Sequence, residues 1–549
     1  MIALLAIHPH AFLSPDNPLG FGIVDFAELA AALILALIIR PRRLVPVWLE
    51  RFAARTGWCM LALAVLPVVL RLALLVHCPV PEPSGSDDFS YLLLADTLRH
   101  GRLANPPHAL PQFFEQIFVL AQPTYSSIYP LGQGLVLALG WIMSGHAWAG
   151  VLLSEAALCA LCYWMLRGWT SPGWALTGGC LALIEFGPLN YWMNCYWGGA
   201  VSAIAGCLVF GALPRLKAQS RIRDAALLGT GLGLQLLTRP FEFVLLAICA
   251  VLFFIPKFWR TFSIAGLVIA AAAGLMLFQN RAVTGSWTTL PYLLYRYQYG
   301  VPASFTFQPN PVPHERLNRE QELDYLAQSA IHGEGTDTIG SYLERLAYRA
   351  RFYRFFLLAP LYLTLLVFLA TVREYRFVWV LLTCFIFAVG TNFYPYFYPH
   401  YVAALASLFL LIAVTGLARM RRAGPVLLVC AAQFVFWYAL HAWGNPKALA
   451  SAGRFETWDF INWGDAEGRL FVDNELARAP GKQLIFVRYG PRHGFHEWVH
   501  NAANIDASRV VFAHDLGAFE NRKLLDYYAD RKVWLLEPDQ WPPRLSPYR

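Results

Sequence analysis

Two adjacent carboxylates, Asp87 and Asp88, form the strongest candidate for catalysis in this chain. They follow the short Ser/Gly segment 84–86, a few residues after a strongly apolar stretch, and they lead into an apolar helical run. A carboxylate at the mouth of a cleft can act as a general base or as a metal ligand. Asp88 or Ser86 can equally serve only to cap the helix that follows. The sequence leaves both interpretations open.

Two groups of aromatic residues have polar tips that suit contact with a sugar or a phosphate. Tyr91, Tyr125 and Tyr129 lie in the same segment as the carboxylates, and Tyr129 directly precedes Pro130. A second group, 394–401, contains Tyr398 and His400, which could stack on a sugar ring. The alternative for both groups is an aromatic belt that anchors the protein at the membrane interface.

Arginines supply the candidate cations for holding an anionic group. Arg239 directly precedes Pro240, at the predicted outer junction of two membrane spans. Its planar guanidinium can bind a phosphate through two parallel hydrogen bonds, whereas a snorkelling role is the alternative. Arg281 and Arg296 are weaker candidates, since an arginine in a loop is usually solvated.

Acidic residues inside predicted spans favour a structural role. An ionised carboxylate is costly inside a membrane. We therefore expect Glu155 and Glu185 to form ion pairs with Arg71 or Arg239.

The histidines and cysteines do not favour a metal site. His493, His496 and His500 have helical spacing that could bind zinc, but no cysteine lies near them. Cys159 and Cys162 lie inside an apolar helix, where they are expected to be packing residues. The sequence leaves the cofactor unknown, and a divalent cation at the carboxylate pair stays compatible with it.

The composition shows that the elements positioning these residues are membrane helices. Of the 549 residues, 57% are hydrophobic and 14% are charged. The net charge of +8 therefore reflects basic loops rather than a nucleic-acid partner. Twelve apolar runs are long enough to be read as spans. They are 23–39, 57–77, 147–166, 174–187, 197–213, 225–239, 241–256, 262–279, 354–371, 377–393, 401–417 and 425–443.

The basic residues predict which loops face the cytoplasm. Short cytoplasmic loops collect Lys and Arg, and with twelve spans 17 such residues fall in six short loops on one side. A thirteenth apolar run, 131–143, would invert this pattern, and its length reaches only about 20 Å at 1.5 Å per residue. We read it as a re-entrant or interfacial helix. Loops 78–146 and 280–352, both termini and the segment 444–549 are then extracytoplasmic, and no signal peptide is evident.

The segment 444–549 is expected to form a small α/β domain that follows the transmembrane domain 1–443. Three short β-type runs, at 484–489, 510–513 and 533–536, alternate with helical patterns near 466–477, 496–503 and 519–529. It has no Gly-rich phosphate loop, so no nucleotide site is predicted.

The order of these features resembles the GT-C superfamily of membrane glycosyltransferases, especially its protein mannosyltransferase-like and aminoarabinose-transferase-like branch. The segment Asp87-Asp88-Phe89-Ser90-Tyr91 is similar to the family's D-E-x-x-Y, and Tyr129-Pro130-Leu131 is similar to its Pro-led juxtamembrane helix. The resemblance implies a polytopic helical fold with about 12 spans, Asp87 as the catalytic carboxylate and Asp88 in support.

Three departures from the family pattern affect the donor. Ser90 stands where the aminoarabinose-type enzymes have a phosphate-binding Arg, and Tyr129 or Ile128 stands where they have a Lys. Their later R-Y-x-x-x-D pattern corresponds here to 190–194, without Arg or Asp. Other residues must therefore hold the donor phosphate, with Arg239 the best candidate.

These observations favour an inverting glycosyltransferase of the bacterial inner membrane. It would move a sugar from a polyprenyl-phosphate donor in the bilayer to an acceptor glycan, lipid or protein at the extracytoplasmic face, with Asp87 as base. The alternative is a membrane transporter or lipid-binding scaffold without chemistry, for which inverted repeats and broken helices would be typical.

Overall fold

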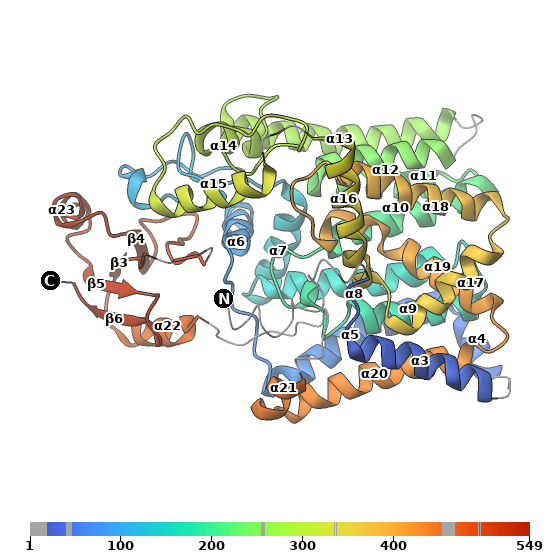
Figure 1. The fold of residues 1–549 in the computed structure, drawn as a ribbon. Helices are drawn as coiled ribbons and strands as arrows, with labels where there is room; N and C mark the ends of the chain where they lie inside the picture. Colours follow the sequence, from blue (N-terminus) through green and yellow to red (C-terminus); the bar gives the residue numbers. More distant parts are fainter. Residues whose placement is uncertain are drawn as a thin grey trace.

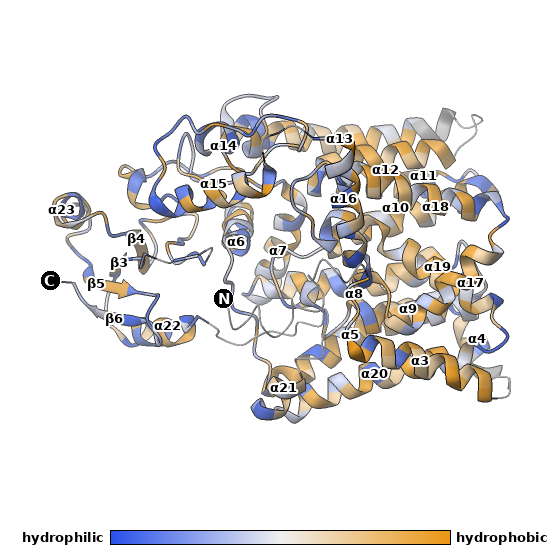
Figure 2. Cartoon of the chain, viewed as in Figure 1, coloured by the Kyte–Doolittle hydropathy of each residue, from blue (hydrophilic) through white to orange (hydrophobic). Residues whose placement is uncertain are grey.

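A long helical bundle with a small α/β unit at one end makes up the molecule (Figure 1). The computed structural model describes residues 19–39, 47–253, 259–333, 335, 337–452, 467–491, 493–494 and 496–548. Apolar residues dominate the bundle, whereas the α/β unit and its neighbouring loops are more polar (Figure 2). The chain is an integral membrane protein, as its composition predicts.

Within the described residues, a helix overlaps each of the twelve predicted spans in whole or in part. These helices are α3 (Ile23–Ile38), α5 (Thr56–Ala73), α8 (Trp148–Leu166), α9 (Pro172–Phe186), α10 (Ala200–Ala218), α11 (Ile222–Thr238), α12 (Pro240–Phe253), α13 (Trp259–Thr284), α17 (Tyr362–Thr371), α18 (Tyr375–Thr391), α19 (Ala406–Arg419) and α20 (Ala423–Trp443). Among the described residues, six helices are long and apolar enough to cross a membrane, or seven if one bent pair is a single span. The count of twelve is therefore not confirmed.

The short apolar helix α7 (Leu131–Ser144) is fixed in place by glycines. A Cβ on Gly140 would lie 1.9 Å from the backbone nitrogen of Gly150 in α8, and a Cβ on Gly150 would lie 2.2 Å from the carbonyl oxygen of Val136. Small residues of this kind let membrane helices approach closely. Because α7 also packs on α6 (Ser86–Arg99), this contact ties the carboxylate-bearing helix to the bundle.

The two long loops carry helices of their own at the end of the bundle that faces the α/β unit. Helices α6 and α16 (Ile339–Arg349) run across the direction of the bundle helices (Figure 1). The remaining elements here are α14 (Pro291–Tyr299), α15 (Arg319–His332) and a two-stranded sheet of β1 (Val119–Leu120) and β2 (Ser126–Ser127). The described residues of the bundle also include the short helices α4 (Val47–Ala53) and α21 (Pro446–Ala452). Their 3₁₀ segments are Leu74–Val76, Pro111–Phe113, Tyr191–Met193, Ala350–Phe356, Ala359–Leu361 and Pro399–Leu405.

The α/β unit contains a four-stranded sheet in the order β4-β3-β5-β6. Strand β3 (Gln483–Val487) pairs in parallel with β4 (Val510–His514) and β5 (Lys532–Glu537), while β6 (Arg544–Pro547) is antiparallel to β5. Helices α22 (Arg469–Arg478) and α23 (Ala518–Tyr527) agree with the sequence-based expectation. The helix expected at 496–503 is wrong, because this segment is irregular. Strand β6 was not anticipated.

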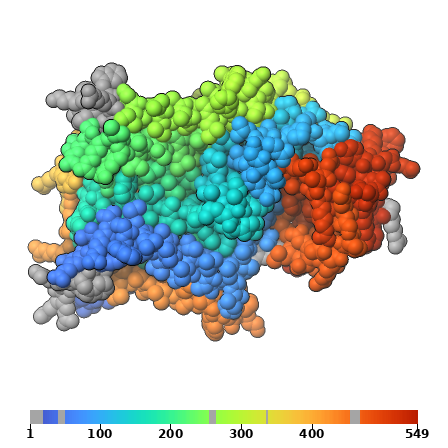
Figure 3. All heavy atoms as spheres, turned by 180° about the vertical axis from the view of Figure 1, so that it is seen from behind, coloured from blue at the N-terminus to red at the C-terminus, as the bar shows by residue number. Residues whose placement is uncertain are grey.

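The α/β unit shares a hydrophobic core with loop 78–146. Leu93, Phe113 and Phe114 of that loop pack with Leu484 and Phe486 of β3. The contact is visible from behind, where the C-terminal residues lie against the light-blue first loop (Figure 3). The unit therefore buttresses the segment that carries the two carboxylates.

Candidate functional site

Asp87 lies in the first turn of α6, where the positive end of the helix dipole favours a carboxylate. The hydroxyl of Tyr129 donates a hydrogen bond to its Oδ1 atom, and the Tyr129 ring stacks on Tyr91 with 4.2 Å between ring centroids. Burial raises the pKa of Asp87, while the Tyr129 hydrogen bond and the charge of Arg239 act in the opposite direction. Asp87 is thus a carboxylate of raised basicity within electrostatic range of a fixed cation.

Asp88 has different partners from its neighbour. Its Oδ1 atom accepts a hydrogen bond from the backbone N–H of Tyr196 at 2.9 Å, and its Oδ2 atom accepts one from that of Ser84 at 3.3 Å. The side chain is buried, and burial raises the pKa of Asp88 to about 7. Asp88 therefore ties the 195–197 segment to the start of α6. The N-cap residue of α6 is Gly85 rather than Ser86 or Asp88, but the bond from Ser84 means that Asp88 still contributes to capping the helix start.

Arg239 belongs to the same site. It ends α11, and Pro240 begins α12 immediately afterwards, so the chain turns sharply at this point. One guanidinium nitrogen lies 3.4 Å from the carboxylate of Glu242, and the guanidinium carbon lies 4.8 Å from the centre of the Tyr401 ring. The Arg239 side chain retains 17% exposure, whereas Glu242 is buried. Arg239 is thus a cation held in place by one buried acid, with part of its surface still accessible.

The ion pairs expected for Glu155 and Glu185 are wrong. Glu242 is the partner of Arg239. Arg71 donates instead to the side chain of Asn194 at 2.8 Å and to two backbone carbonyls at the start of loop 78–146. Both carboxyl oxygens of Glu155 are buried without a hydrogen-bond partner among the described residues. The charge on Glu185 acts on Arg354.

The turn 394–401 brings Tyr398 and His400 towards the carboxylate. Burial raises the pKa of Tyr398, and the charge of Asp87 raises it further, which places the two side chains within electrostatic range. The rings of Tyr398 and His400 stack with 5.6 Å between centroids. Asp87, Tyr91, Tyr129, Arg239, Tyr398 and His400 therefore converge on one region.

Three other predicted binding residues have different surroundings. Tyr125 is buried between Gln116 and the backbone of Asn501, at the contact with the α/β unit. Arg281 bonds to the carbonyl of Gly285 just after α13. Arg296 bonds to the carbonyl of Pro302 at 2.9 Å and lies 4.9 Å from the ring centre of Tyr292. Of these three residues, only Arg296 adjoins the site. Its neighbour Tyr292 lies in electrostatic range of Arg239 and Glu242.

Sequence reasoning missed two acidic residues of the site. Glu242 lies three residues after Arg239, the spacing of an ion pair within a helical turn, and this signal could have identified it. Asp324 of α15 is buried, and both of its oxygens accept hydrogen bonds from Gln328 at 2.9 Å. Burial raises the pKa of Asp324 to about 7, and the charge of Asp87 contributes in the same direction. Nothing in the sequence of loop 280–352 singles Asp324 out.

No group of three or more metal-ligating side chains occurs in the part of the chain that the structure describes. The three histidines of the tail have separate partners. His493 contacts Asp539 at 2.8 Å, His496 contacts Glu467 at 2.6 Å, and His500 stacks on Phe89. Since these histidines do not share a helix face, the zinc spacing has no structural counterpart.

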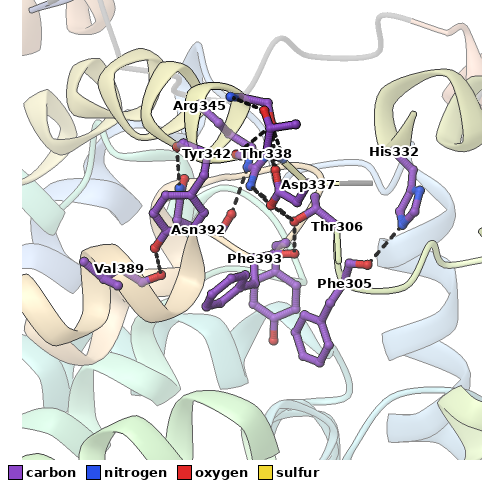
Figure 4. A network of polar contacts seen from close by, with 12 residues as sticks. Phe305, Thr306, His332, Asp337, Thr338, Tyr342, Arg345, Val389, Asn392 and Phe393 are labelled. Atoms are coloured by element: carbon purple, nitrogen blue, oxygen red, sulfur yellow. Dashed lines mark hydrogen bonds and ion pairs between the residues drawn. The ribbon is translucent and has the colours of Figure 1, made fainter. Parts of the chain in front are cut away.

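A polar network fixes the turn that leads to Tyr398 and His400 (Figure 4). Arg345 of α16 pairs with Asp337 at 2.5 Å and donates to the carbonyl of Asn392 at 2.9 Å. The backbone N–H of Thr306 donates to the carbonyl of Phe393 at 2.9 Å, and its hydroxyl donates to Asp337 at 2.7 Å. Three segments, around 306, 337–345 and 392–393, are thereby locked together beside the site.

Breaking this network is expected to destabilise the protein measurably. Asp337→Asn removes a mostly buried ion-pair partner, so the free energy of unfolding should fall by about 1–3 kcal/mol. Hydrogen bonds from Arg345, Thr306 and Ser341 outweigh burial and lower the pKa of Asp337. Its contribution is therefore present above the ordinary pKa of an aspartate and is lost as the pH falls through the lowered value.

The matched control for this prediction is Glu374→Gln. Glu374 is well exposed and forms ion pairs with Arg376, which is also well exposed, and with Arg419 at 3.6 Å. Such a pair contributes about 0–1 kcal/mol, so the control should barely change the thermal midpoint in detergent. Equal midpoints for the Asp337→Asn and Glu374→Gln variants would contradict the role of the network.

Comparisons with known proteins identify the fold. No protein-family model and no curated protein match the sequence. The structure of ArnT from Cupriavidus metallidurans bound to undecaprenyl phosphate is similar at a TM-score of 0.50 and 11% identity, over 88% of this chain and 93% of that one. The apo form of the same ArnT gives a TM-score of 0.48 at 12% identity over the same shares. The oligosaccharyltransferase AglB from Archaeoglobus fulgidus, in complex with an inhibitory peptide and a dolichol-phosphate, gives 0.40 at 12% identity over 88% of this chain and 69% of that one. The likeness to lipid-bound ArnT shows the fold, and the predicted GT-C type of fold is confirmed.

Proposed function

We propose that this protein is a glycosyltransferase that moves a sugar from a polyprenyl-phosphate donor to an acceptor hydroxyl. The observation that carries the proposal is the convergence of Asp87 and Arg239. The two residues lie 152 positions apart in the sequence, yet Gly132, three residues after the Asp87 partner Tyr129, packs directly against Thr238, the neighbour of Arg239. A base and a fixed cation facing one region are what a displacement at a phosphate-linked carbon requires.

The chemistry follows from these two groups. Asp87 takes the proton of the acceptor hydroxyl while the hydroxyl oxygen forms a bond to the anomeric carbon. The bond from that carbon to the phosphate oxygen breaks at the same time, and Arg239 stabilises the negative charge that remains on the lipid phosphate. A single displacement of this kind inverts the anomeric centre.

A shallow apolar surface on α12 suits the lipid part of the donor. This groove is lined by Phe243, Val244, Ala247, Ile248, Val251 and Leu252, all of α12. Because α12 begins at Pro240, directly after Arg239, a polyprenyl chain lying along this groove would bring its phosphate to the guanidinium. The fold likeness to ArnT bound to undecaprenyl phosphate is consistent with this arrangement.

The activity is tested with a labelled donor. Purified protein in lipid nanodiscs is incubated with undecaprenyl-phosphate-linked sugars carrying a radioactive label and with a membrane extract as the source of acceptors. We expect label to pass to an acceptor and free undecaprenyl phosphate to accumulate, and we expect neither with Asp87→Asn protein. Tight donor binding without transfer, for every sugar, would favour a transporter or a lipid-binding scaffold instead.

We further propose that the site faces the outside of a bacterial inner membrane. In this arrangement the loops 78–146 and 280–352, both termini and the α/β unit are extracytoplasmic, which agrees with the 17 basic residues in the opposite short loops. Gln219 and Phe519 are exposed positions at which single cysteines test this topology.

A membrane-impermeant thiol reagent applied to intact cells should modify Phe519→Cys but not Gln219→Cys. Permeabilised cells serve as the control, since both positions should then react. Modification of Gln219→Cys in sealed cells would contradict the topology.

A further inference from the structure

Four ring side chains form a compact wall beside the candidate site. Trp197, in the segment between α9 and α10, has its ring centroid 4.8 Å from that of His400, 5.9 Å from that of Tyr191 and 6.0 Å from that of Tyr398. We call these four residues the Trp197 cluster. They come from two segments about 200 residues apart, so tertiary packing alone creates the cluster.

Two polar atoms in the Trp197 cluster make no well-aligned hydrogen bond within the described residues, although the Trp192 indole lies within reach of the Tyr191 hydroxyl. They are the hydroxyl of Tyr191 and the Nδ1 atom of His400, and both are buried. Buried polar atoms are nearly always paired in native proteins, and an unpaired one costs free energy. A ligand that brings its own hydroxyl groups would remove this cost. Only 4% of His400 is exposed, whereas 48% of Tyr398, which stacks on it, is exposed. A modest shift of Tyr398 would therefore open His400 to a ligand.

The Trp197 cluster adjoins the reacting groups. The His400 ring lies 4.7 Å from that of Tyr401, and the centre of the Tyr401 ring lies 4.8 Å from the guanidinium carbon of Arg239. If the donor phosphate lies at Arg239, the group attached to that phosphate comes within reach of the cluster.

Three carboxylates near the cluster already have partners, and Glu155, whose carboxyl oxygens have none among the described residues, is completely enclosed within α8. Asp88 accepts two backbone hydrogen bonds, Glu242 pairs with Arg239, and Asp87 receives the Tyr129 hydroxyl. None of these acids is left to pair with an ammonium group on a sugar. Aromatic faces with neutral hydrogen-bonding tips suit the apolar faces and hydroxyl groups of an uncharged pyranose.

We propose that the Trp197 cluster binds the sugar of the donor and that this sugar is uncharged. The inference rests on the proposed function, because it takes Arg239 as the phosphate site. It assigns Tyr191, Trp197 and His400 as specificity-determining residues.

The test measures binding of lipid probes to the full-length protein in nanodiscs. The probes are undecaprenyl phosphate alone, its glucose, mannose and galactose derivatives, and its 4-amino-4-deoxyarabinose derivative. We expect at least one uncharged sugar derivative to bind more tightly than undecaprenyl phosphate and more tightly than the amino sugar derivative. Tyr191→Phe and His400→Gln should each reduce this gain by about 3- to 10-fold, the value of one hydrogen bond. Both variants should leave the affinity for undecaprenyl phosphate unchanged.

The matched control is Tyr297→Phe. Tyr297 is 58% exposed and stacks on His314 in loop 280–352, so its hydroxyl should not affect binding of any probe. The inference is overturned if no uncharged derivative binds better than undecaprenyl phosphate, if the amino sugar binds best, or if the gain survives in Tyr191→Phe and His400→Gln. If the gain survives in these two variants, a bound water and not the sugar forms hydrogen bonds with the Tyr191 hydroxyl and the His400 Nδ1 atom. Failure of undecaprenyl phosphate itself to bind would instead refute the proposed function.

Discussion

Replacing Asp87 by Asn is expected to lower the rate of sugar transfer by about 10²–10⁴-fold, the usual contribution of one positioned base. The amide preserves the shape of the side chain and can still accept the hydrogen bond from Tyr129, but it cannot take a proton from the acceptor. The thermal midpoint should therefore change little. Initial rates of label transfer at saturating donor, beside a melting curve for each variant, measure both effects.

Asp88→Asn is the neighbouring control for this result. Asp88 accepts hydrogen bonds from two backbone N–H groups and does not receive the Tyr129 hydroxyl, so its loss should act on the shape of the loop and reduce transfer less. If Asp88→Asn abolished transfer while Asp87→Asn kept near-normal turnover, the assignment would be off by one residue. If neither variant lost activity, both carboxylates would be structural.

The pH dependence of transfer should carry the signature of the same carboxylate. Burial raises the pKa of Asp87, and a base must be ionised to act, so activity should fall with decreasing pH at values above the ordinary pKa of an aspartate. The hydrogen bond from Tyr129 lowers the pKa of Asp87. Tyr129→Phe should therefore move the acidic limb of the rate profile to higher pH, and an unmoved limb would contradict the assignment.

Replacing Arg239 is expected to weaken donor binding by about 10- to 100-fold for Ala and by less for Lys. A hydrogen bond to a charged group contributes roughly 1.5–3 kcal/mol, and Lys keeps the charge but not the two-pronged geometry. Titration with undecaprenyl phosphate measures the affinity directly.

A structural role for Arg239 gives a different result. Arg239→Ala leaves Glu242 buried without its cation, so this variant should also lose thermal stability. The double variant Arg239→Ala, Glu242→Gln removes both charges and should recover stability but not affinity. Unchanged affinity with a lowered melting point would show that Arg239 is only structural, and Arg296 would become the next candidate for the phosphate.

Much of this site follows from local sequence. Three short motifs can be located relative to the apolar runs from the sequence alone. They are the acidic pair after a Ser/Gly segment, the Tyr-Pro before α7 and the Arg-Pro between two helices. The strands β3, β4 and β5 were also predictable, because each is a short β-type run bounded by turn residues.

The remaining features depend on contacts between distant segments. Which carboxylate meets Tyr129 is decided by the backbone N–H of Tyr196, which holds Asp88. Tyr125 was expected in the site, but packing of the α/β unit on loop 78–146 buries it elsewhere. Spacing along one helix can suggest a pair such as Arg239 and Glu242, but it cannot reveal that Trp197 and His400 meet.

The central claim is that a lipid phosphate binds at Arg239, beside Asp87. An electron cryomicroscopy structure of the protein in nanodiscs with undecaprenyl phosphate tests this claim most directly. The account predicts phosphate density within hydrogen-bonding distance of the Arg239 guanidinium, with the chain of the lipid along Phe243, Val244 and Ala247 of α12. Phosphate density at Arg281 or Arg296, or lipid bound on a face of the bundle away from α12, would contradict it.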